Sequence, residues 1–396
     1  MSISDTEPVT LWHGMFQRLL LETDRREAAE GDQPESRLDA AVYHDPRRHQ
    51  AERTHLFHRL PLCLGHADQL REPGSVLARE IAGLPLLLMR DAAGEIGVFL
   101  NACRHRGACL VTEEGVIHTR SSLSCRYHGW TYDLAGALVS VPRREAFPTL
   151  DRAARGLRRL PATVRHGLIW AVLDPQLEEA PDMREHLGAL DGELAALGLG
   201  QHRFFRQHAV HRAANWKLIV DAFMEVYHVR RLHAGTIGPF FADSQAVSDH
   251  LGPHQRMLVA RDTLSELSAL PPARWSPQRH GTLVHLIFPN TILIYHPDYI
   301  SHLGIFPTAP GGSLFVHTML TPELPADDKA KAHWDRSFDL IDAAVFNAED
   351  LFICEQIQRG LASGASTDFV LGRFEDNVRR FHETIADTLR AAGEEG

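Results

Sequence analysis

The sequence contains little cysteine: five residues among 396, at positions 63, 103, 109, 125 and 354. This number is too small for a disulfide scaffold, so each cysteine is either a small buried apolar side chain or part of a reactive site. Long apolar runs are also missing. The most apolar stretch near the N-terminus, FQRLLLE, is short and flanked by charges, whereas a membrane-spanning helix needs about 20 apolar residues. We therefore expect a cytoplasmic protein that does not enter a membrane.

An excess of positive charge is missing too, because 41 lysines and arginines face 51 acidic residues and the net charge is −10. This balance argues against non-specific binding to nucleic acids or anionic lipids. Neither a G-x-G-x-x-G motif nor a P-loop occurs, which argues against a built-in Rossmann domain for a nicotinamide or flavin cofactor. Histidine is abundant, with 25 residues, so only histidines at constrained spacings are informative.

The chain divides into three segments by its residue pattern. Residues 1–47 have a helical pattern followed by polar residues, and we expect them to pack on the C-terminal domain. Residues 48–170 contain short β-type runs separated by glycine and proline, which predicts a small all-β domain. Residues 171–396 contain strands followed by long helices, at about 327–362 and 375–392. This order predicts an α+β domain in which helices cover one face of an antiparallel sheet.

Cysteine and histidine alternate in two short motifs of the β-rich segment. The first, CRHRG, provides Cys103 and His105, and the second, CRYHGW, provides Cys125 and His128. Zinc sites more often use two neighbouring cysteines followed by two histidines. One thiolate and one imidazole from each loop instead suit a 2Fe-2S centre in which two thiolates bind one iron and two imidazoles the other. The alternative is a pair of buried cysteines with unrelated histidines.

These motifs, within NACRHRGACL and LSCRYHGWTYDLAGAL, resemble the Rieske domain of ring-hydroxylating oxygenase α subunits. The resemblance implies that Cys103 and Cys125 bind one iron of a Rieske 2Fe-2S cluster and that His105 and His128 bind the other. Respiratory Rieske proteins have a hydroxyl donor to the cluster sulfur at the position of Trp130. Fewer hydrogen bonds to sulfur predict a low reduction potential, near about −150 mV.

A second set of polar residues lies in NWKLIVDAFMEVYHVRRLH. We predict a long helix capped by Asn215, which places Asp221, Glu225 and His228 on one face at i, i+4 and i+7. Charged side chains among apolar ones are costly to bury unless they are paired or bind a metal. His233 is about 140° further round an ideal helix, so both imidazoles reach one ion only if the helix ends or widens between them.

A third ligand has to come from elsewhere, since two histidines and one carboxylate on one side of a metal leave positions open for oxygen and substrate. Asp350 is the candidate, because its helical face points toward the core, whereas Glu349 is rotated by about 100°. The apolar residues expected on that face are Phe346, Ile353, Cys354 and Ile357. Considered alone, these polar residues also fit a polar seam between helices.

The pattern N-W-K, followed by an acidic residue three positions before H-x4-H, is similar to the mononuclear iron site of the same oxygenase family. The resemblance implies a helix-grip, START-like catalytic domain in which His228, His233 and Asp350 bind Fe(II). It also implies a head-to-tail homotrimer in which an acidic residue connects neighbouring subunits. We predict that Glu225 bridges His128 of the partner subunit and its own His228. Aspartate is more usual at this position, and glutamate is similar to the branch that acts on quaternary ammonium compounds.

Several side chains near these motifs allow two interpretations. Asn215 is a helix cap or a contact of the iron pocket, and Asp221 either supports a ligand histidine or pairs with an arginine. His285 and His296 face the substrate pocket or the core. Three aromatic residues are expected in the core rather than in a substrate cage: Trp216, Phe223 and Tyr227.

The chain has no flavin, nicotinamide or plant-type ferredoxin motif, so a separate reductase, with or without a ferredoxin, has to supply electrons. We expect the terminal oxygenase of an NAD(P)H-dependent system that uses O2 to mono- or dihydroxylate an aromatic or related small molecule. We expect a homotrimer, with or without β subunits. The alternatives are oxidative demethylation of a quaternary ammonium or N- or O-methylated substrate, a Rieske electron carrier or redox sensor, and a structural zinc protein.

Overall fold

The computed structural model describes residues 8–26 and 35–394. They form two compact units, of which the smaller is Phe57–His186 and the larger contains the rest of the described chain. The domain boundaries expected at 48 and 170 lie somewhat earlier in the sequence than this division, and they remain predictions. Within the described ranges we find no helix that has both the length and the apolar composition of a membrane span.

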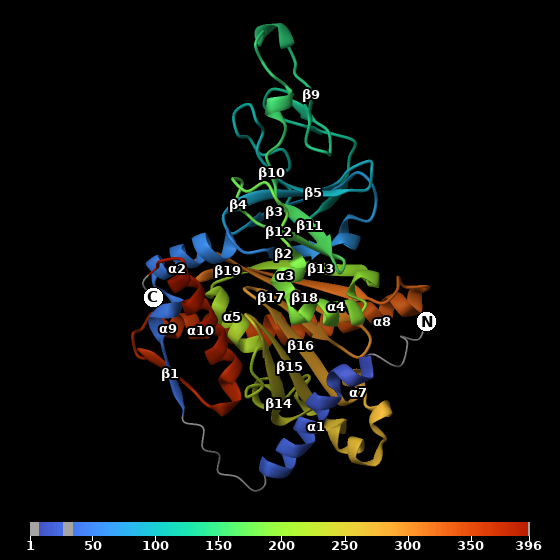
Figure 1. Ribbon diagram of the computed structural model, residues 1–396, viewed down its shortest axis with the longest axis vertical. Coiled ribbons are helices and arrows are strands. Elements are labelled where there is room, and N and C mark those ends of the chain that lie inside the picture. Colours follow the sequence, from blue (N-terminus) through green and yellow to red (C-terminus); the bar gives the residue numbers. More distant parts are fainter. Residues whose placement is uncertain (1–7, 27–34, 395–396) are drawn as a thin grey trace. The chain divides into compact units, whose positions relative to one another are not determined.

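The smaller unit consists of short antiparallel strands in three sheets (Figure 1). The sheets have the strand orders β10-β5-β4-β3-β6, β11-β12-β2 and β7-β8-β9. Their strands are β2 (Leu62–His66), β3 (Ser75–Ile81), β4 (Leu84–Arg90), β5 (Ile96–Leu100), β6 (Ile117–Thr119), β7 (Leu123–Ser124), β8 (Thr131–Tyr132), β9 (Leu138–Ser140), β10 (Arg159–Leu160), β11 (Ala162–Arg165) and β12 (Leu168–Ala171). The all-β character predicted for this segment is confirmed.

The larger unit contains a seven-stranded antiparallel sheet with the order β13-β19-β18-β17-β16-β15-β14. Its strands are β13 (Arg203–Arg212), β14 (Phe241–Leu251), β15 (His254–Arg261), β16 (Gly281–Ile287), β17 (Thr291–Tyr295), β18 (Ile300–Ala309) and β19 (Gly312–Thr321). A separate two-stranded sheet pairs β1 (Ser36–Asp39) with β20 (Asp368–Leu371). Strands β16 to β19 are buried along nearly their whole length, so the core lies on this sheet.

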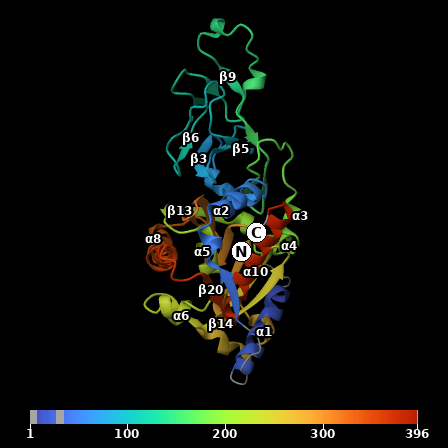
Figure 2. The same cartoon turned by 90° about the vertical axis from the view of Figure 1, so that its left-hand side faces the viewer.

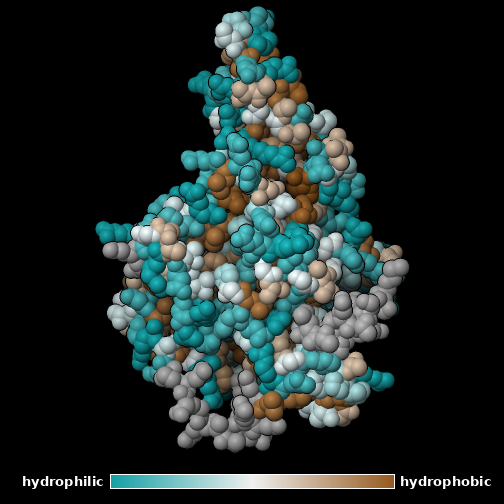
Figure 3. All heavy atoms as spheres, in the orientation of Figure 1, coloured by the Kyte–Doolittle hydropathy of each residue, from teal (hydrophilic) through white to brown (hydrophobic). Residues whose placement is uncertain are grey.

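Helices pack on the sheet of the larger unit, as predicted for an α+β fold. The α-helices of the described chain are α1 (Pro8–Arg26), α2 (Pro46–Glu52), α3 (Met183–Leu187), α4 (Ala189–Ala196), α5 (Trp216–Phe223), α6 (Val229–Leu232), α7 (Pro277–His280), α8 (Asp328–Asp339), α9 (Leu351–Leu361) and α10 (Asp376–Ala391). Helix α5 contacts β18, β19 and α9, whereas α1 contacts β14. Figure 2 shows α1 beside β14. On the face shown in Figure 3, the larger unit is mainly hydrophilic with small hydrophobic areas.

The helix predicted from Asn215 through the EVYH motif is shorter than expected. Asn215 caps α5, because its side-chain oxygen accepts a backbone N–H two residues later at 2.9 Å. After α5 ends, the carboxylate of Glu225 accepts the backbone N–H groups of Tyr227 and His228 and so starts a new turn. Glu225 and His228 therefore do not share a helical face with Asp221, and that prediction is wrong.

The helical segment expected at about 327–362 is present, but its central part is not an α-helix. It begins as α8, continues as a π-helix over Leu340–Asp350 and ends as α9. π-Helices are usually single turns and occur frequently at functional sites. Asp350, the last residue of this π-helix, is buried.

Candidate metal centres

The two Cys-His motifs of the smaller unit form loops with the same backbone hydrogen bonds. In each loop the N–H of the cysteine, Cys103 or Cys125, donates to the carbonyl five residues later, at 2.9 and 2.8 Å. The N–H of the following glycine, Gly107 or Gly129, donates back to the cysteine carbonyl, at 2.8 and 2.9 Å. Both glycines have positive φ angles, of 83° and 72°, which side chains with a Cβ rarely adopt. The two motifs are therefore structural copies of one loop.

The two loops pair cysteine with cysteine and histidine with histidine. Cys103 and Cys125 are buried in the same apolar cluster. The ring centroids of His105 and His128 are 4.7 Å apart, and His128 is exposed. The thiols are therefore buried and the imidazoles lie nearer the surface.

The donor set fits a 2Fe-2S cluster with two thiolate and two imidazole ligands. The Nδ1 atom of His105 is buried and, among the described residues, has no hydrogen-bond partner. Buried polar atoms almost always have a partner, so this nitrogen is available to a metal. The indole of Trp130 stacks on the His105 ring at 4.7 Å and fixes its orientation.

Tyr132 is a residue that the sequence analysis missed. Its hydroxyl lies 3.4 Å from Sγ of Cys103 and accepts the backbone N–H of Arg104 at 2.9 Å. Burial and, after it, the hydrogen bond with Cys103 raise the pKa of Tyr132. The hydroxyl therefore stays protonated and can donate a hydrogen bond to a thiolate. The sequence-based expectation considered a hydroxyl only at the position of Trp130, where none is present.

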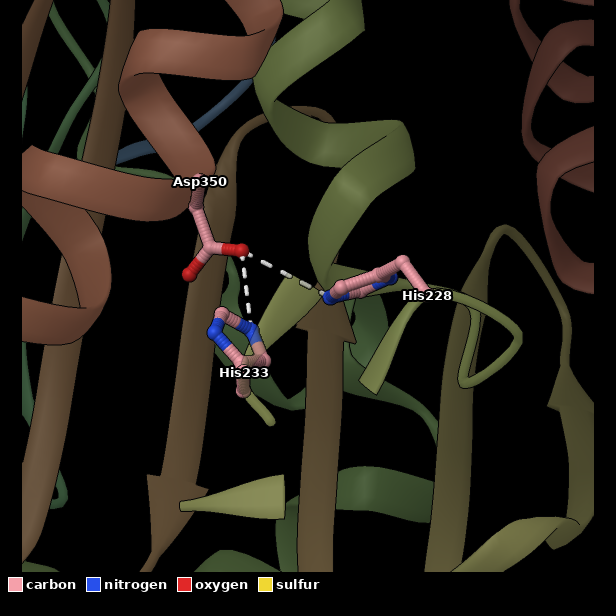
Figure 4. Close-up of side chains that lie close together, drawn as sticks. All are labelled: His228, His233 and Asp350. Atoms are coloured by element: carbon pink, nitrogen blue, oxygen red, sulfur yellow. Dashed lines mark ion pairs between the residues drawn. The ribbon is translucent and has the colours of Figure 1, made fainter. Parts of the chain in front are cut away.

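His228, His233 and Asp350 lie together in the larger unit, as Figure 4 shows. One ligand atom from each lies within 4.8 Å of the others. Oδ1 of Asp350 is 3.5 Å from Nε2 of His228 and 3.1 Å from Nε2 of His233. The short helix α6 separates the two histidines, so both rings can turn toward the carboxylate. The structure therefore brings together the three residues of the second predicted set.

Two carboxylates contact the opposite nitrogens of these imidazoles. Oε1 of Glu225 makes a close contact with Nδ1 of His228, and Oε2 of Glu349 lies 2.7 Å from Nδ1 of His233. Such carboxylates fix the orientation of metal-binding histidines and leave Nε2 as the ligand atom. Glu349, which was expected to be rotated about 100° from Asp350, is not one of the three grouped ligand residues and contacts the site through His233 instead.

The three candidate ligands carry an unusual set of charges. Burial opposes a charge on His228, but hydrogen bonds to Asp350 and Glu225 outweigh it and raise the pKa of His228 to about 10. Burial would also raise the pKa of Asp350, but its hydrogen bonds to His228 and His233 lower it instead. The raised pKa favours a protonated His228 when no metal is bound, and a divalent cation that takes this nitrogen has to displace its proton.

The candidate ligands line a cavity of about 220 Å³. Its walls are mainly apolar, and they include Phe223, Phe241, Met257, Ile294, Val345 and Phe346. Besides Glu225 and the candidate ligands, the cavity is lined by the polar side chains of Arg261, Thr282 and His296. A small, mostly apolar molecule fits this lining.

A second hollow, of about 520 Å³, shares Glu225, His228 and Asp350 with this cavity. It is lined by residues of α5, α9 and β20, including Ile353 and Ile357. These two side chains are 36% and 37% exposed, so the expectation that they lie on a core-facing helical face is wrong. Glu225 thus lies between an apolar cavity and an open apolar groove.

The other side chains with two interpretations now have defined positions. Asp221 accepts from Tyr43 Oη at 2.6 Å and lies 3.1 Å from Nε2 of His382, and among the described side chains it contacts neither a candidate ligand nor an arginine. His285 is fully buried against Glu193, at 2.9 Å. Trp216 is in the core, as expected, whereas Phe223 lines the cavity and Tyr227 is 61% exposed. His296 also lines the cavity.

Two family models match the chain. The Rieske [2Fe-2S] domain matches residues 61–151, and the ring hydroxylating alpha subunit (catalytic domain) matches residues 199–391. The biphenyl 2,3-dioxygenase subunit alpha of Rhodococcus jostii (strain RHA1) is 30% identical over 284 residues, which are 66% of this chain and 54% of that subunit. The carnitine monooxygenase oxygenase subunit of Acinetobacter baumannii is 27% identical over 325 residues, 79% of this chain and 81% of that one.

The same architecture occurs in a solved structure. Naphthalene 1,2-dioxygenase from Rhodococcus sp., bound to indole, superposes with a TM-score of 0.76 over 96% of this chain and 99% of that chain, at 22% identity. This similarity describes the fold. The alignment with the biphenyl dioxygenase subunit spans only about half of that subunit, 54%.

Proposed function

Since this chain belongs to the Rieske oxygenases, with a Rieske domain and the catalytic domain of a ring-hydroxylating α subunit, we propose that it is the terminal oxygenase of a hydroxylating enzyme system. The observation that carries the proposal is the convergence of His228, His233 and Asp350 beside an apolar cavity. Two histidines and a carboxylate on one side of Fe(II) leave positions for O2 and substrate. An electron carrier or redox sensor has no use for such a site.

In this proposal the smaller unit binds the Rieske cluster, with Cys103 and Cys125 on one iron and His105 and His128 on the other. The larger unit binds the mononuclear iron through Nε2 of His228, Nε2 of His233 and the carboxylate of Asp350. The cluster supplies single electrons, and the ferrous ion supplies the site where O2 is activated. The residues around the ion exclude bulk water and fix the two imidazoles through Glu225 and Glu349.

Glu225 has the position required of a bridge between subunits. Its carboxylate contacts His228 and also lines the open groove, so it can accept a hydrogen bond from outside the subunit. We assign that donor to His128 of the partner subunit in a head-to-tail homotrimer, with or without β subunits. Because the chain has no flavin or nicotinamide motif, a separate reductase completes the electron path.

The cavity also favours one class of substrate. The guanidinium of Arg261 lines it, lies 5.4 Å from the ring centre of Phe241 and forms no hydrogen bond or ion pair within the described chain. Burial lowers the pKa of Arg261, with partial compensation by Asp262, so an anionic group is needed to balance its charge. An aromatic ring with a carboxylate satisfies both the apolar walls and Arg261. A substrate whose only charge is a quaternary ammonium would be repelled.

The test combines metal analysis with a matched substrate panel and a surrogate reductase. We expect about three irons per chain, two of them in the cluster, and O2-dependent product from benzoate in preference to toluene and choline. Arg261→Gln should raise KM for benzoate about tenfold, the size expected for one lost charged contact, while toluene oxidation stays unchanged. Product from choline but not from benzoate would favour oxidative demethylation instead. A colourless protein containing zinc would contradict the whole proposal.

A further inference from the structure

Positive charge is concentrated in the part of the smaller unit that contains the two Cys-His loops. Residues 104–159 include ten arginines, no lysine and five acidic residues, which gives this segment a net charge of +5. The whole chain has a net charge of −10, so the other residues together carry −15. A basic surface on an otherwise acidic protein attracts partners with an acidic surface.

Four of these arginines surround one hollow of about 600 Å³, which we call the arginine hollow. Arg104 of the first Cys-His loop lines it together with Arg158, which precedes β10, and Arg159, which begins β10. Arg155 lies beside them, because its Nη1 atom donates to the backbone carbonyl of Arg104 at 3.4 Å. Among the described residues of the lining Glu178 is the only acidic one, so the lining has an excess of positive charge.

No described carboxylate neutralises these four arginines through an ion pair. Arg158 donates to the backbone carbonyl of Pro175, and the guanidinium of Arg159 lies 5.8 Å from the ring centre of Phe99. All of them except the partly buried Arg104 are exposed. Their charges are therefore accessible to a partner, and a carboxylate that enters the hollow can accept charge-assisted hydrogen bonds from them.

The arginine hollow adjoins the first loop of the candidate cluster site. Arg104 is bonded through the backbone to two candidate ligand residues, Cys103 and His105. Its backbone N–H donates to the Tyr132 hydroxyl at 2.9 Å, and this hydroxyl lies 3.4 Å from Sγ of Cys103. A group that is held in the hollow is therefore connected to both ligand residues of this loop through a single residue.

The second Cys-His loop is separate from the arginine hollow, whose described lining includes none of residues 123–132. Arg106, by contrast, donates to the Tyr127 hydroxyl at 3.1 Å, and the ring centroids of Tyr127 and His128 are 3.7 Å apart. In the proposed trimer His128 contacts Glu225 of the partner subunit, so an electron donor has to reach the cluster from another side. The arginine hollow provides such a side.

We propose that the arginine hollow is the docking site of the electron donor, a one-electron carrier protein with an acidic surface. The inference rests on the proposed oxygenase function, in which a separate protein reduces the cluster. A carboxylate of the donor pairs with Arg155, Arg158 and Arg159, and the redox group of the donor is held beside Arg104. One electron passes to the oxidised cluster, so the donor is oxidised by one electron and no covalent bond changes. The electron enters at the first loop and leaves through His128 on the second.

The test follows reduction of the cluster in the holoenzyme by stopped-flow absorption without O2. The probe is a previously reduced, acidic plant-type ferredoxin, whose potential is lower than that of a Rieske cluster. Arg158→Glu and Arg159→Glu reverse single charges at exposed positions, and Arg159→Lys preserves the charge. Arg120→Glu is the matched control, because Arg120 is exposed and follows β6, at the opposite edge of the five-stranded sheet from β10.

At low ionic strength we expect each charge reversal to lower the second-order rate constant about tenfold and the double variant about 10²-fold, within the range of electrostatic steering. In Arg159→Lys and Arg120→Glu the cluster should be reduced as fast as in the original enzyme. At an ionic strength of about 1 M, where the screening length is about 3 Å, all rate constants should converge. Calorimetry with oxidised ferredoxin should give the same order of affinities. The cluster potential and the Rieske spectrum should stay unchanged, because the substituted side chains are exposed.

Equal rate constants for the two charge reversals and Arg120→Glu at low ionic strength would overturn the docking site. So would a cluster that dithionite reduces but ferredoxin does not, or a slower reduction that a lower cluster potential explains. A changed number of subunits in Arg158→Glu and Arg159→Glu would assign the hollow to a second copy of this chain and overturn the proposal as well. An original protein without any reducible 2Fe-2S cluster would instead contradict the oxygenase proposal.

Discussion

The two candidate metal centres are constructed from the chain in opposite ways. In the smaller unit, four residues between 103 and 128 lie on two loops with the same backbone hydrogen bonds and glycines of positive φ. In the larger unit, His233 and its partner Glu349 are 116 residues apart, and the site combines an irregular segment with a π-helix. The loops need only local backbone geometry, whereas the mononuclear site exists only after the sheet and helices have packed. The first centre should therefore tolerate changes in the second.

The largest effect is expected from Asp350→Asn. The amide cannot provide the charge that the imidazoles and the cation require, so the mononuclear iron should be lost while the cluster remains. Iron content should fall by about one third, from about three to two per chain, and turnover should disappear. Metal analysis and the electron paramagnetic resonance signal of the reduced cluster measure both outcomes.

Asp339→Asn is the matched control for this variant. Asp339 belongs to the same helical segment but is exposed and pairs with Arg206 at 2.9 Å. It should keep all its iron. Loss of the cluster signal in Asp350→Asn, with the control intact, would show that the two centres depend on each other for folding.

Glu225→Gln should give the next largest effect, and it tests the connection between the centres. The amide oxygen can still accept the backbone N–H groups of Tyr227 and His228, so the local turn should persist. The charge that orients His228 and the partner's His128 is lost. We expect both metals to remain but oxidation of the reduced cluster by O2 and substrate to slow about 10²-fold, as misplacement of reacting groups does. Rapid-mixing spectroscopy measures this rate, and normal coupled turnover would contradict the bridge.

Glu349→Gln should have a smaller effect, confined to the mononuclear site. Loss of a carboxylate behind a ligand histidine typically lowers metal affinity about 10- to 100-fold. Fe(II) titration of the iron-depleted site should show this decrease, and the cluster spectrum should stay the same. An unchanged Fe(II) affinity would show that the charge of Glu349, to which the Thr236 hydroxyl donates at 2.8 Å, does not orient His233.

The contrast between the two centres also explains what the sequence could predict. The two Cys-His loops are local features whose spacing and glycines can be read from the sequence, and the assignment of Cys103, His105, Cys125 and His128 as cluster ligands stays a prediction. His228, His233 and Asp350 were also identified, but His228 was placed on the helix that starts at Asn215, and this helix ends before Glu225. Glu349 was set aside as a ligand because it is rotated from Asp350, and its contact with His233 could not be predicted, since helical periodicity contains no signal for a contact across 116 residues.

The overall fold was more accessible than the details of the second site. Alternating strands and long C-terminal helices predicted the α+β architecture, because these patterns are set by burial on a sheet. Pairings across many strands could not be predicted, because contacts between distant strands leave no local signal in the sequence. His285 and His296 occur in similar apolar contexts, yet one contacts Glu193 in the core and the other lines the cavity.

The smallest effect is expected from Tyr132→Phe, which affects only the first centre. The Tyr132 hydroxyl can donate to Sγ of Cys103, at 3.4 Å, and such a bond stabilises the more negative, reduced cluster. Its removal should lower the reduction potential and leave iron content and Fe(II) affinity unchanged. Tyr127→Phe is the control, because Tyr127 is exposed and its hydroxyl accepts from Arg106 rather than contacting a thiol. If voltammetry gives the same potential for both variants, the hydroxyl does not tune the cluster.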